Sequence, residues 1–293
     1  MSRLKLRCAE KINLSLDVTG KRPDGYHNIE SIFQSVSIYD ELELTVTEGE
    51  GISLTCSGND EVPCDERNIA WKAAQAMLDA SGRQAKIAIH IDKHIPSGAG
   101  MGGGSADAAG VLSGLNKLLG CDLSLQTLCE MGAKLGADVP FILVGGSALV
   151  FGIGEVIKPV KPMDEEICLL ILKGTEGIST PAAYKAIDSL EKPPHPDTFA
   201  VLRAVETKNR ALLCESCGNL FDLVTQCADV ERAKARALEL GAECAVMTGS
   251  GAAVFAVMPK VPDEQIMAKL REEFAFAAIA YPVRCSIEAI SAS

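Results

Sequence analysis

Apolar and polar residues alternate along several segments of the chain, and a period of two is typical of strands buried on one face. The alternation is clearest at residues 12–18, 42–46 and 86–91, and further strands are predicted at 147–151, 167–172 and 252–258. Helices are predicted at residues 67–80, 105–119 and 124–135, and glycines that commonly follow a helix end the first two. The pattern alone therefore predicts a mixed α and β protein.

Length and composition bound the domain organisation. The chain has 293 residues, of which 47% are apolar and 23% are charged, as in globular proteins. This length suits one compact unit of two lobes, or two domains with separate cores. A new series of strands and helices begins after Pro159 and Pro162. We therefore place the lobe boundary near residue 153, with lobes at residues 1–153 and 154–293.

Charge and cysteine content narrow the class of protein. The net charge of −11 argues against nucleic acid as a partner. The longest uncharged stretches, such as residues 139–154, contain glycines and are too short for a membrane span. The N-terminus lacks the apolar core of a signal peptide, and the eleven cysteines are scattered and odd in number, unlike a secreted disulfide scaffold. We therefore expect a cytoplasmic protein without membrane partners.

Two local features leave alternatives open. Residues 1–27 carry a net charge of +3, which suits either an anionic small ligand or a solvated strand edge with lysines. Cys214 and Cys217 form the only C-x-x-C. Because no second pair stands at zinc-finger spacing, two reduced thiols on neighbouring helical turns are favoured over a metal site.

A glycine-rich stretch lies between the strand at 86–91 and the helix at 105–119. Glycines let the backbone approach oxyanions closely, and the N-terminus of a helix attracts negative charge. This order of strand, glycine loop and helix therefore indicates a phosphate site. The residues expected to form it are Pro96, Ser97, Gly98, Ala99, Gly100, Met101, Gly102, Gly103, Gly104, Ser105 and Ala106.

Two commoner glycine motifs fit this stretch less well. A Walker A loop ends in Gly-Lys-Ser/Thr, and no lysine is present here. Gly98, Gly100 and Gly103 match G-x-G-x-x-G, and Asp122 lies about twenty residues on, as in a dinucleotide-binding fold. However, four residues separate the strand from the loop, where the dinucleotide fold turns directly.

The stretch Pro96-Ser-Gly-Ala-Gly-Met-Gly-Gly-Gly-Ser-Ala-Asp-Ala-Ala resembles the ATP-phosphate motif of the GHMP kinases, with Met101 in the place of the usual leucine. Ala106 stands where many members have a second serine. The stretches Ala9-Glu-Lys-Ile-Asn-Leu and Thr248-Gly-Ser-Gly-Ala-Ala-Val-Phe are similar to the first and third motifs of that family. The three stretches together span nearly the whole chain.

One branch of the family is most similar. Arg22-Pro-Asp-Gly-Tyr-His and Gly136-Ala-Asp-Val-Pro-Phe resemble the 4-diphosphocytidyl-2-C-methyl-D-erythritol kinases. The resemblance implies ATP-dependent phosphorylation of the 2-hydroxyl of that CDP-linked sugar alcohol, in the methylerythritol phosphate route to isoprenoids. The alternatives are another GHMP kinase, of the mevalonate or homoserine type, and a non-catalytic nucleotide-binding relative.

The resemblance also implies roles for individual residues. Asp138 is the expected base for the substrate hydroxyl, and Lys11 would hold that carboxylate ionised. Asn13 lies on the same side of its strand as Lys11 and would hydrogen-bond the hydroxyl or a phosphate. Tyr26 and His27 are expected at the cytidine.

The cofactors and the remaining contacts follow in the same way. Tyr184 is the expected second stacking aromatic at the cytidine, and Asn68 and Lys93 would approach the ATP base. Mg²⁺ is expected because ATP enters as its magnesium complex, and Ser105 is the candidate protein ligand. Both partners are thus small molecules, and the protein is expected to be a monomer or a weak homodimer.

The resemblance further implies an α+β fold of two lobes. It implies a ribosomal-protein-like N-terminal lobe with a left-handed crossover and a ferredoxin-like C-terminal lobe. The active site is expected between the two lobes.

Overall fold

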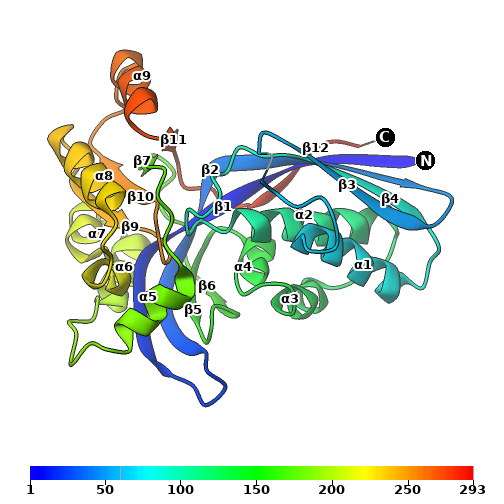
Figure 1. The fold of residues 1–293 in the computed structure, drawn as a ribbon, viewed down its shortest axis with the longest axis horizontal. Coiled ribbons are helices and arrows are strands. Elements are labelled where there is room, and N and C mark those ends of the chain that lie inside the picture. The colour runs from blue at the N-terminus through cyan, green and yellow to red at the C-terminus, as the bar shows by residue number, and fades with distance from the viewer. Residues whose placement is uncertain (60, 293) are drawn as a thin grey trace.

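The computed structural model describes residues 1–59 and 61–292. Within these residues the strands form two β-sheets, one of eight strands and one of four. Figure 1 shows the sheets in separate lobes, with the long β1–β2 hairpin running from the larger lobe toward the smaller one. In the described residues no helix is long and apolar enough to cross a membrane.

The larger sheet has the order β12-β1-β2-β4-β3, and three short strands extend it, with β5 on β2, β6 on β5 and β8 on β1. Its strands are β1 (Ser2–Lys21), β2 (His27–Thr47), β3 (Gly51–Ser57), β4 (Lys86–Asp92), β5 (Ser147–Phe151), β6 (Val156–Pro159), β8 (Gly218–Asn219) and β12 (Ile287–Ala292). β12 lies antiparallel to β1, so the end of the chain returns to the sheet that its beginning started.

The strand β1 is longer than the segment of clear alternation in the sequence. The register of β1 against β2 shifts between Ala9 and Glu10, and again between Asn13 and Ser15. Such bulges bend a strand and redirect its side chains, and they are frequent beside functional sites. The two shifts flank Lys11 and Asn13.

Helices cover one face of the larger sheet (Figure 1). They are α1 (Ile69–Ser81), α2 (Gly103–Leu118), α3 (Leu125–Ala133) and α4 (Val139–Val144). α2 packs directly on β1 and β2 through Gly110 and Gly114, because a Cβ on either glycine would lie 2.4 Å from a side-chain atom of Cys8 or Leu44. The predicted helices lie within two residues of these bounds, and α2 begins at Gly103 rather than at Ser105.

The smaller sheet is antiparallel with the order β11-β7-β10-β9. Its strands are β7 (Cys168–Lys173), β9 (Cys244–Met247), β10 (Val254–Met258) and β11 (Phe276–Ala280). The helices of this lobe are α5 (Thr180–Ile187), α6 (Thr198–Thr207), α7 (Arg210–Ser216), α8 (Ala228–Glu239) and α9 (Glu264–Glu273), with the 3₁₀ turn η1 (Leu220–Leu223). The strand order 4-1-3-2 is that of a ferredoxin-like sheet, and the expected α+β fold is confirmed.

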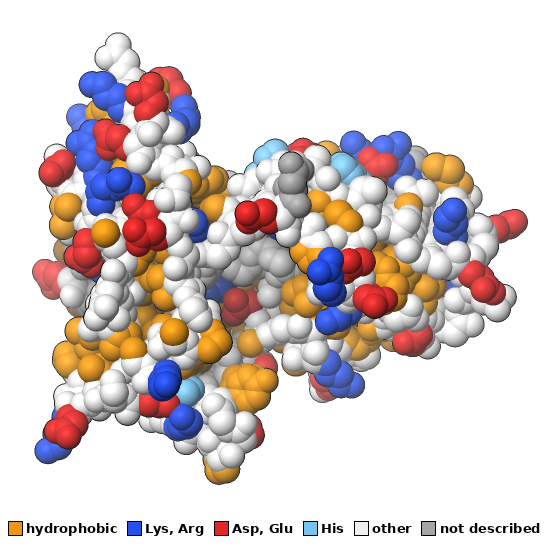
Figure 2. All heavy atoms as spheres, viewed as in Figure 1, with side chains coloured by type: hydrophobic (Ala, Val, Ile, Leu, Met, Phe, Trp, Pro, Cys, Tyr) orange, Lys and Arg blue, Asp and Glu red, His pale blue; other side chains and the backbone are white. Residues whose placement is uncertain are grey.

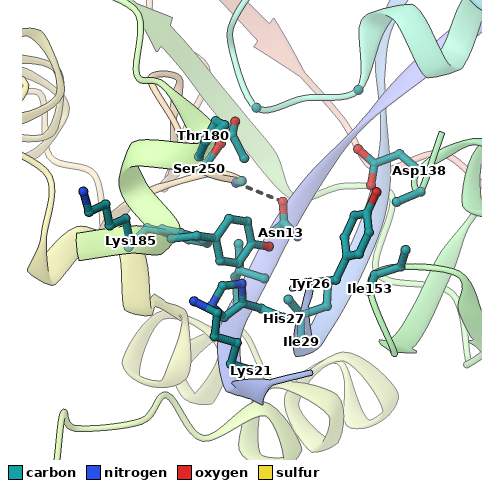
Figure 3. Close-up of a pocket in the computed structure, with 18 of the residues that line it drawn as sticks. Asn13, Lys21, Tyr26, His27, Ile29, Asp138, Ile153, Thr180, Lys185 and Ser250 are labelled. Atoms are coloured by element: carbon teal, nitrogen blue, oxygen red, sulfur yellow. Dashed lines mark hydrogen bonds between the residues drawn. The ribbon is translucent and has the colours of Figure 1, made fainter. Parts of the chain in front are cut away.

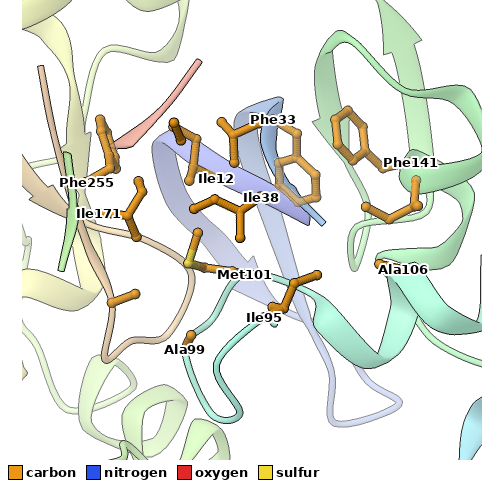
Figure 4. Packing of buried hydrophobic residues seen from close by; sticks show 14 of the residues in the cluster. Ile12, Phe33, Ile38, Ile95, Ala99, Met101, Ala106, Phe141, Ile171 and Phe255 are labelled. Carbon is orange, nitrogen blue, oxygen red and sulfur yellow. The ribbon is translucent and has the colours of Figure 1, made fainter. Parts of the chain in front are cut away.

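One apolar core joins the two lobes. Figure 4 shows Ile12 and Phe33 of the larger sheet, Met101 of the glycine loop, and Ile171 and Phe255 of the smaller sheet in one continuous cluster. Met101 is 1% exposed, which explains why an apolar residue stands inside a glycine loop. The core therefore holds that loop at the junction of the two lobes. The boundary near residue 153 stays a prediction.

Candidate active site

The glycine loop connects β4 to α2 and takes its shape from residues with positive φ. Gly98, Gly100 and Gly102 have φ angles of 62°, 74° and 82°, a region that side chains with a Cβ rarely adopt. Gly102 occupies the N-cap position of α2, so the free N–H groups of the first helical turn follow it directly. This arrangement can bind the phosphates of a nucleotide.

A second glycine turn, at residues 248–251, packs against the loop. The carbonyl oxygens of Gly98 and Ala99 accept hydrogen bonds from the N–H groups of Ala252 and Ala253, at 3.2 and 3.1 Å. A Cβ on Gly100 would lie 2.4 Å from the carbonyl oxygen of Thr248, so the two backbones can approach only because no side chain is present. Two of the three similar stretches in the sequence thus meet in space.

Lys11 reaches this junction from β1 and is 4% exposed. Its Nζ donates to the Oδ1 of Asn13 at 2.8 Å and to the carbonyl oxygen of Gly100 at 3.0 Å. The Oδ2 of Asp138 lies 3.7 Å from the same Nζ. Because an ammonium has three protons, two are fixed by the protein and the third is left for Asp138 or for a substrate oxygen between them.

Asp138 precedes α4 and occupies its N-cap position, yet its side chain makes no capping hydrogen bond. Its side chain is 28% exposed, so it is accessible from the cavity that it lines. A Cβ on Gly102 would lie 3.4 Å from its Oδ2. The carboxylate therefore stands beside the glycine loop, at the wall of the cavity.

Asn13 is 1% exposed, and its side chain is engaged within the protein. Its Oδ1 accepts from Lys11, from the N–H of Gly249 at 2.9 Å and from the hydroxyl of Thr248 at 3.2 Å, and its Nδ2 donates to Ser31. These contacts give Asn13 an orienting role, in which it holds Lys11 against the second glycine turn. Its direct contact with substrate stays a prediction.

The other end of the cavity is aromatic. The rings of His27 and Tyr184 are stacked, with centroids 4.6 Å apart and planes at 18°, and Tyr184 meets Phe221 edge to face at 4.9 Å. Burial raises the pKa of Tyr184 to about 12, so its hydroxyl is neutral. Tyr26 is 61% exposed and lies across the cavity from His27 (Figure 3).

A cavity of about 840 Å³ joins these two ends and draws its lining from both lobes. Figure 2 shows the face of the molecule hollowed between the lobes. A smaller cavity of about 340 Å³ lies on the other side of the glycine loop. Both are lined by Gly100 and Gly102. The site therefore consists of two pockets that meet at the glycine loop, next to Lys11 and Asp138.

Asn68 and Lys93 both line the smaller cavity. The Oδ1 of Asn68 caps α1 by accepting from the N–H of Ala70 at 2.9 Å. Lys93 forms ion pairs with Asp40 and Asp107, the latter at 2.8 Å. Both residues therefore form part of the wall of the smaller cavity, and their contact with an ATP base stays a prediction.

Several residues of the site were not predicted from the sequence. Asp188 binds His27 and Lys21, and Thr180 bonds Ser250 across the cavity wall, with 2.7 Å between the hydroxyl oxygens. One signal was present: Asp188 follows Tyr184 by four residues, so both lie on one face of a helix. This helix, α5, has Ser179 at its N-cap position and Pro181 at its second helical position.

A magnesium ion has few candidate protein ligands here. In residues 1–59 and 61–292 no three His, Cys, Asp or Glu side chains are grouped to hold a metal. Ser105 lies half-buried in the first turn of α2, but it is not among the residues that line either cavity, and its Oγ would lie 3.4 Å from a Cβ on Gly136. The expected binding of Mg²⁺ through Ser105 stays a prediction.

Comparison with known proteins places the chain in a family. The GHMP kinases N terminal domain matches residues 68–146, and the GHMP kinases C terminal family matches residues 201–275. The chain is 40% identical to a 4-diphosphocytidyl-2-C-methyl-D-erythritol kinase of Geobacillus kaustophilus over 258 residues, covering 87% of this chain and 88% of the relative. An enzyme of the same name from Bacillus subtilis is also 40% identical, over 261 residues.

Solved structures agree with this assignment. A crystal structure of 4-(cytidine 5'-diphospho)-2C-methyl-D-erythritol kinase matches with a TM-score of 0.75 and 30% identity, covering 96% of this chain and 99% of that one. A homoserine kinase from Cytophaga hutchinsonii matches with a TM-score of 0.74 at 18% identity, which shows a shared fold only. The chain therefore belongs to the 4-diphosphocytidyl-2-C-methyl-D-erythritol kinase family of the GHMP kinases.

Proposed function

We propose that the chain transfers the γ-phosphate of ATP to the 2-hydroxyl of 4-diphosphocytidyl-2-C-methyl-D-erythritol. The observation that carries this proposal is the meeting of two pockets at Gly100 and Gly102, beside Lys11 and Asp138. ATP would enter the smaller pocket with its phosphates on the first turn of α2. The cytidylyl substrate would enter the larger pocket, whose lining includes His27 and Tyr184 as well as Lys11 and Asp138.

The chemistry follows from the positions of the two charged groups. Asp138 accepts the proton of the substrate hydroxyl as that oxygen forms its bond to the γ-phosphorus. The bond between the γ-phosphorus and the bridging oxygen breaks, and ADP leaves. Lys11 faces the same oxygen with its third proton and offsets negative charge on the transferring group. The loop N–H groups would bind the phosphates. A Mg²⁺ ion that enters with ATP would neutralise further charge, and Ser105 in the first turn of α2 is the residue that would hold it.

The cytidine would be held at the far end of the larger pocket. Tyr26 is exposed there and can stack on the base, and stacking of this kind contributes about 1–3 kcal/mol. Tyr184 and His27 form the opposite wall. Every group named lies on one chain, so the site needs no second copy, and we propose that the protein acts as a monomer or a weak homodimer.

The direct test is an ADP-release assay with Mg-ATP and four acceptors. These are 4-diphosphocytidyl-2-C-methyl-D-erythritol, mevalonate, homoserine and galactose. Turnover confined to the cytidylyl substrate supports the proposal, and mass spectrometry of the product locates the new phosphate. Turnover with another acceptor alone would overturn the substrate assignment and keep the phosphate loop. No turnover with any acceptor would favour a non-catalytic nucleotide-binding protein.

A further inference from the structure

His27 has two ring nitrogens with different surroundings. Its Nε2 lies 2.7 Å from the Oδ1 of Asp188. Its Nδ1 has no partner in the part of the chain that the structure describes, and it is not sealed from solvent. The residue as a whole is 9% exposed and lines the larger cavity, so the ring offers its free nitrogen to a ligand there (Figure 3).

Asp188 decides which nitrogen of His27 carries the proton. The other oxygen of Asp188 accepts from Lys21 at 2.5 Å, and hydrogen bonds from Lys21 and His27 lower the pKa of this carboxyl. An ionised carboxylate only accepts hydrogen bonds. The Nε2 of His27 must therefore be the donor, and in the neutral imidazole the Nδ1 is then an acceptor.

The ring cannot change this arrangement easily. Tyr184 stacks on its face, and Phe221 supports Tyr184 from behind. The side chain is thus held between a stacked aromatic ring and a fixed carboxylate. A ligand that meets Nδ1 must supply an N–H or O–H donor at that point, because an acceptor there would face an unshared pair.

We infer that Asp188 is a positioning residue that sets base selectivity, by holding His27 in the tautomer whose Nδ1 accepts from an amino group of the ligand. This inference rests on the proposed function, in which a cytidine 5'-diphosphate group enters this end of the cavity. Cytosine offers a 4-amino donor, whereas uracil offers a 4-carbonyl acceptor that Nδ1 rejects. The selected class is therefore aminopyrimidine nucleotides over oxopyrimidine nucleotides.

Asp188→Asn tests this mechanism. The amide nitrogen of asparagine can donate to Nε2, which stabilises the opposite tautomer and turns Nδ1 into a donor. Binding of CDP and of UDP is measured by calorimetry, beside the kcat/KM values of the two corresponding methylerythritol substrates. We expect the preference of the native chain for cytosine, about 10- to 100-fold, to fall at least tenfold in the variant, with the KM for ATP unchanged.

Lys21→Met is the matched control, because it removes the other partner of Asp188 and leaves the bond to His27. Its CDP-to-UDP ratio should stay that of the native chain, whatever its absolute affinity. A ratio that stays unchanged in Asp188→Asn would overturn the inference. So would a loss of selectivity in Lys21→Met equal to that in Asp188→Asn, since general charge would then explain both.

Nitrogen NMR identifies the tautomer of His27 independently of enzymatic turnover. The chain has four histidines, so the signals of His27 are assigned as those lost in His27→Gln. Long-range ¹H–¹⁵N spectra at pH 7.5 should show a protonated Nε2 and a bare Nδ1. A doubly protonated ring, or a proton on Nδ1, would overturn the inference. Correct NMR and CDP selectivity without phosphoryl transfer would instead leave the inference standing and refute the proposed function.

Discussion

Asp138→Asn separates the chemistry of this site from its stability. The substitution keeps the size and shape of the side chain and removes the base. Asp138 stands at the N-cap position of α4 without making a capping hydrogen bond, so the helix loses no bond. The carboxylate does pair with Lys11 at 3.7 Å, so we expect the free energy of unfolding to fall by up to about 1 kcal/mol, as for a partly exposed ion pair.

The effect on turnover should be large. Removal of a positioned general base typically lowers a rate by about 10²–10⁴, which corresponds to about 2.7–5.5 kcal/mol of transition-state stabilisation at 1.36 kcal/mol per factor of ten. Because Asp138 lies beside the reacting groups and not at the cytidine end, the loss should fall on kcat, with both KM values nearly unchanged. The assay is steady-state ADP release, together with urea unfolding of the same preparations.

Asp263→Ala gives the opposite result and serves as the control. Asp263 caps α9 by accepting from the N–H of Ile266 at 2.9 Å, and it is not among the residues that line either cavity. Its loss should cost about 1 kcal/mol of stability and leave kcat unchanged. An Asp138→Asn protein that turns over within threefold of the native rate would remove Asp138 as the base. An equal loss of kcat in both variants would show that the assay reports folding.

Three further predictions concern other parts of the molecule. Thr248→Val removes the hydroxyl that accepts a hydrogen bond from the buried N–H of Asn13 at 2.9 Å. Thermal unfolding should therefore show a loss of about 1–3 kcal/mol in the free energy of unfolding, kcat should fall, and Thr248→Ser should restore both. A Thr248→Val protein that is stable and active would exclude the orienting role of Asn13. Tyr26→Ala should raise KM for the cytidylyl substrate and leave that for ATP alone, and equal effects on both would contradict stacking. Glu10 is fully buried, neither of its oxygens has a partner among the described residues, and burial raises its pKa. Its contribution to the free energy of unfolding should therefore be greatest below about pH 4.3 and fall by up to about 1.4 kcal/mol per pH unit as the pH rises through the raised pKa. Urea unfolding between pH 5 and 8 measures this slope, which Glu10→Gln should abolish.

Much of the fold was predictable because its signals are local. Alternation marked the half-buried strands, and glycines marked the ends of α1 and α2, so these elements appear close to their predicted bounds. The full length of β1 was not predicted, because the buried Glu10 interrupts the row of apolar residues that stand at every second position from Leu4 to Val18. The pairing of β12 with β1 was not predicted either, because the sequence of a six-residue strand does not indicate which distant strand it pairs with.

The candidate site was also predictable only where its signals are local. The glycine loop carries its chemistry in consecutive residues, so its role was visible in the sequence. The orienting contacts of Asn13 were not, because they depend on Thr248 and Gly249 arriving from more than 230 residues away. The bond between His27 and Asp188 joins two lobes, and only the folded chain reveals it.

The return of β12 to β1 has a consequence for synthesis on the ribosome. β1 emerges well before its neighbour, because the strand that covers one of its edges is made more than 260 residues later. In the interval that edge presents unpaired N–H and C=O groups, which are a template for pairing with another nascent chain. The charged residues Arg3, Lys5 and Arg7 lie on this stretch of β1, and like charges on neighbouring polysomal chains would oppose such pairing.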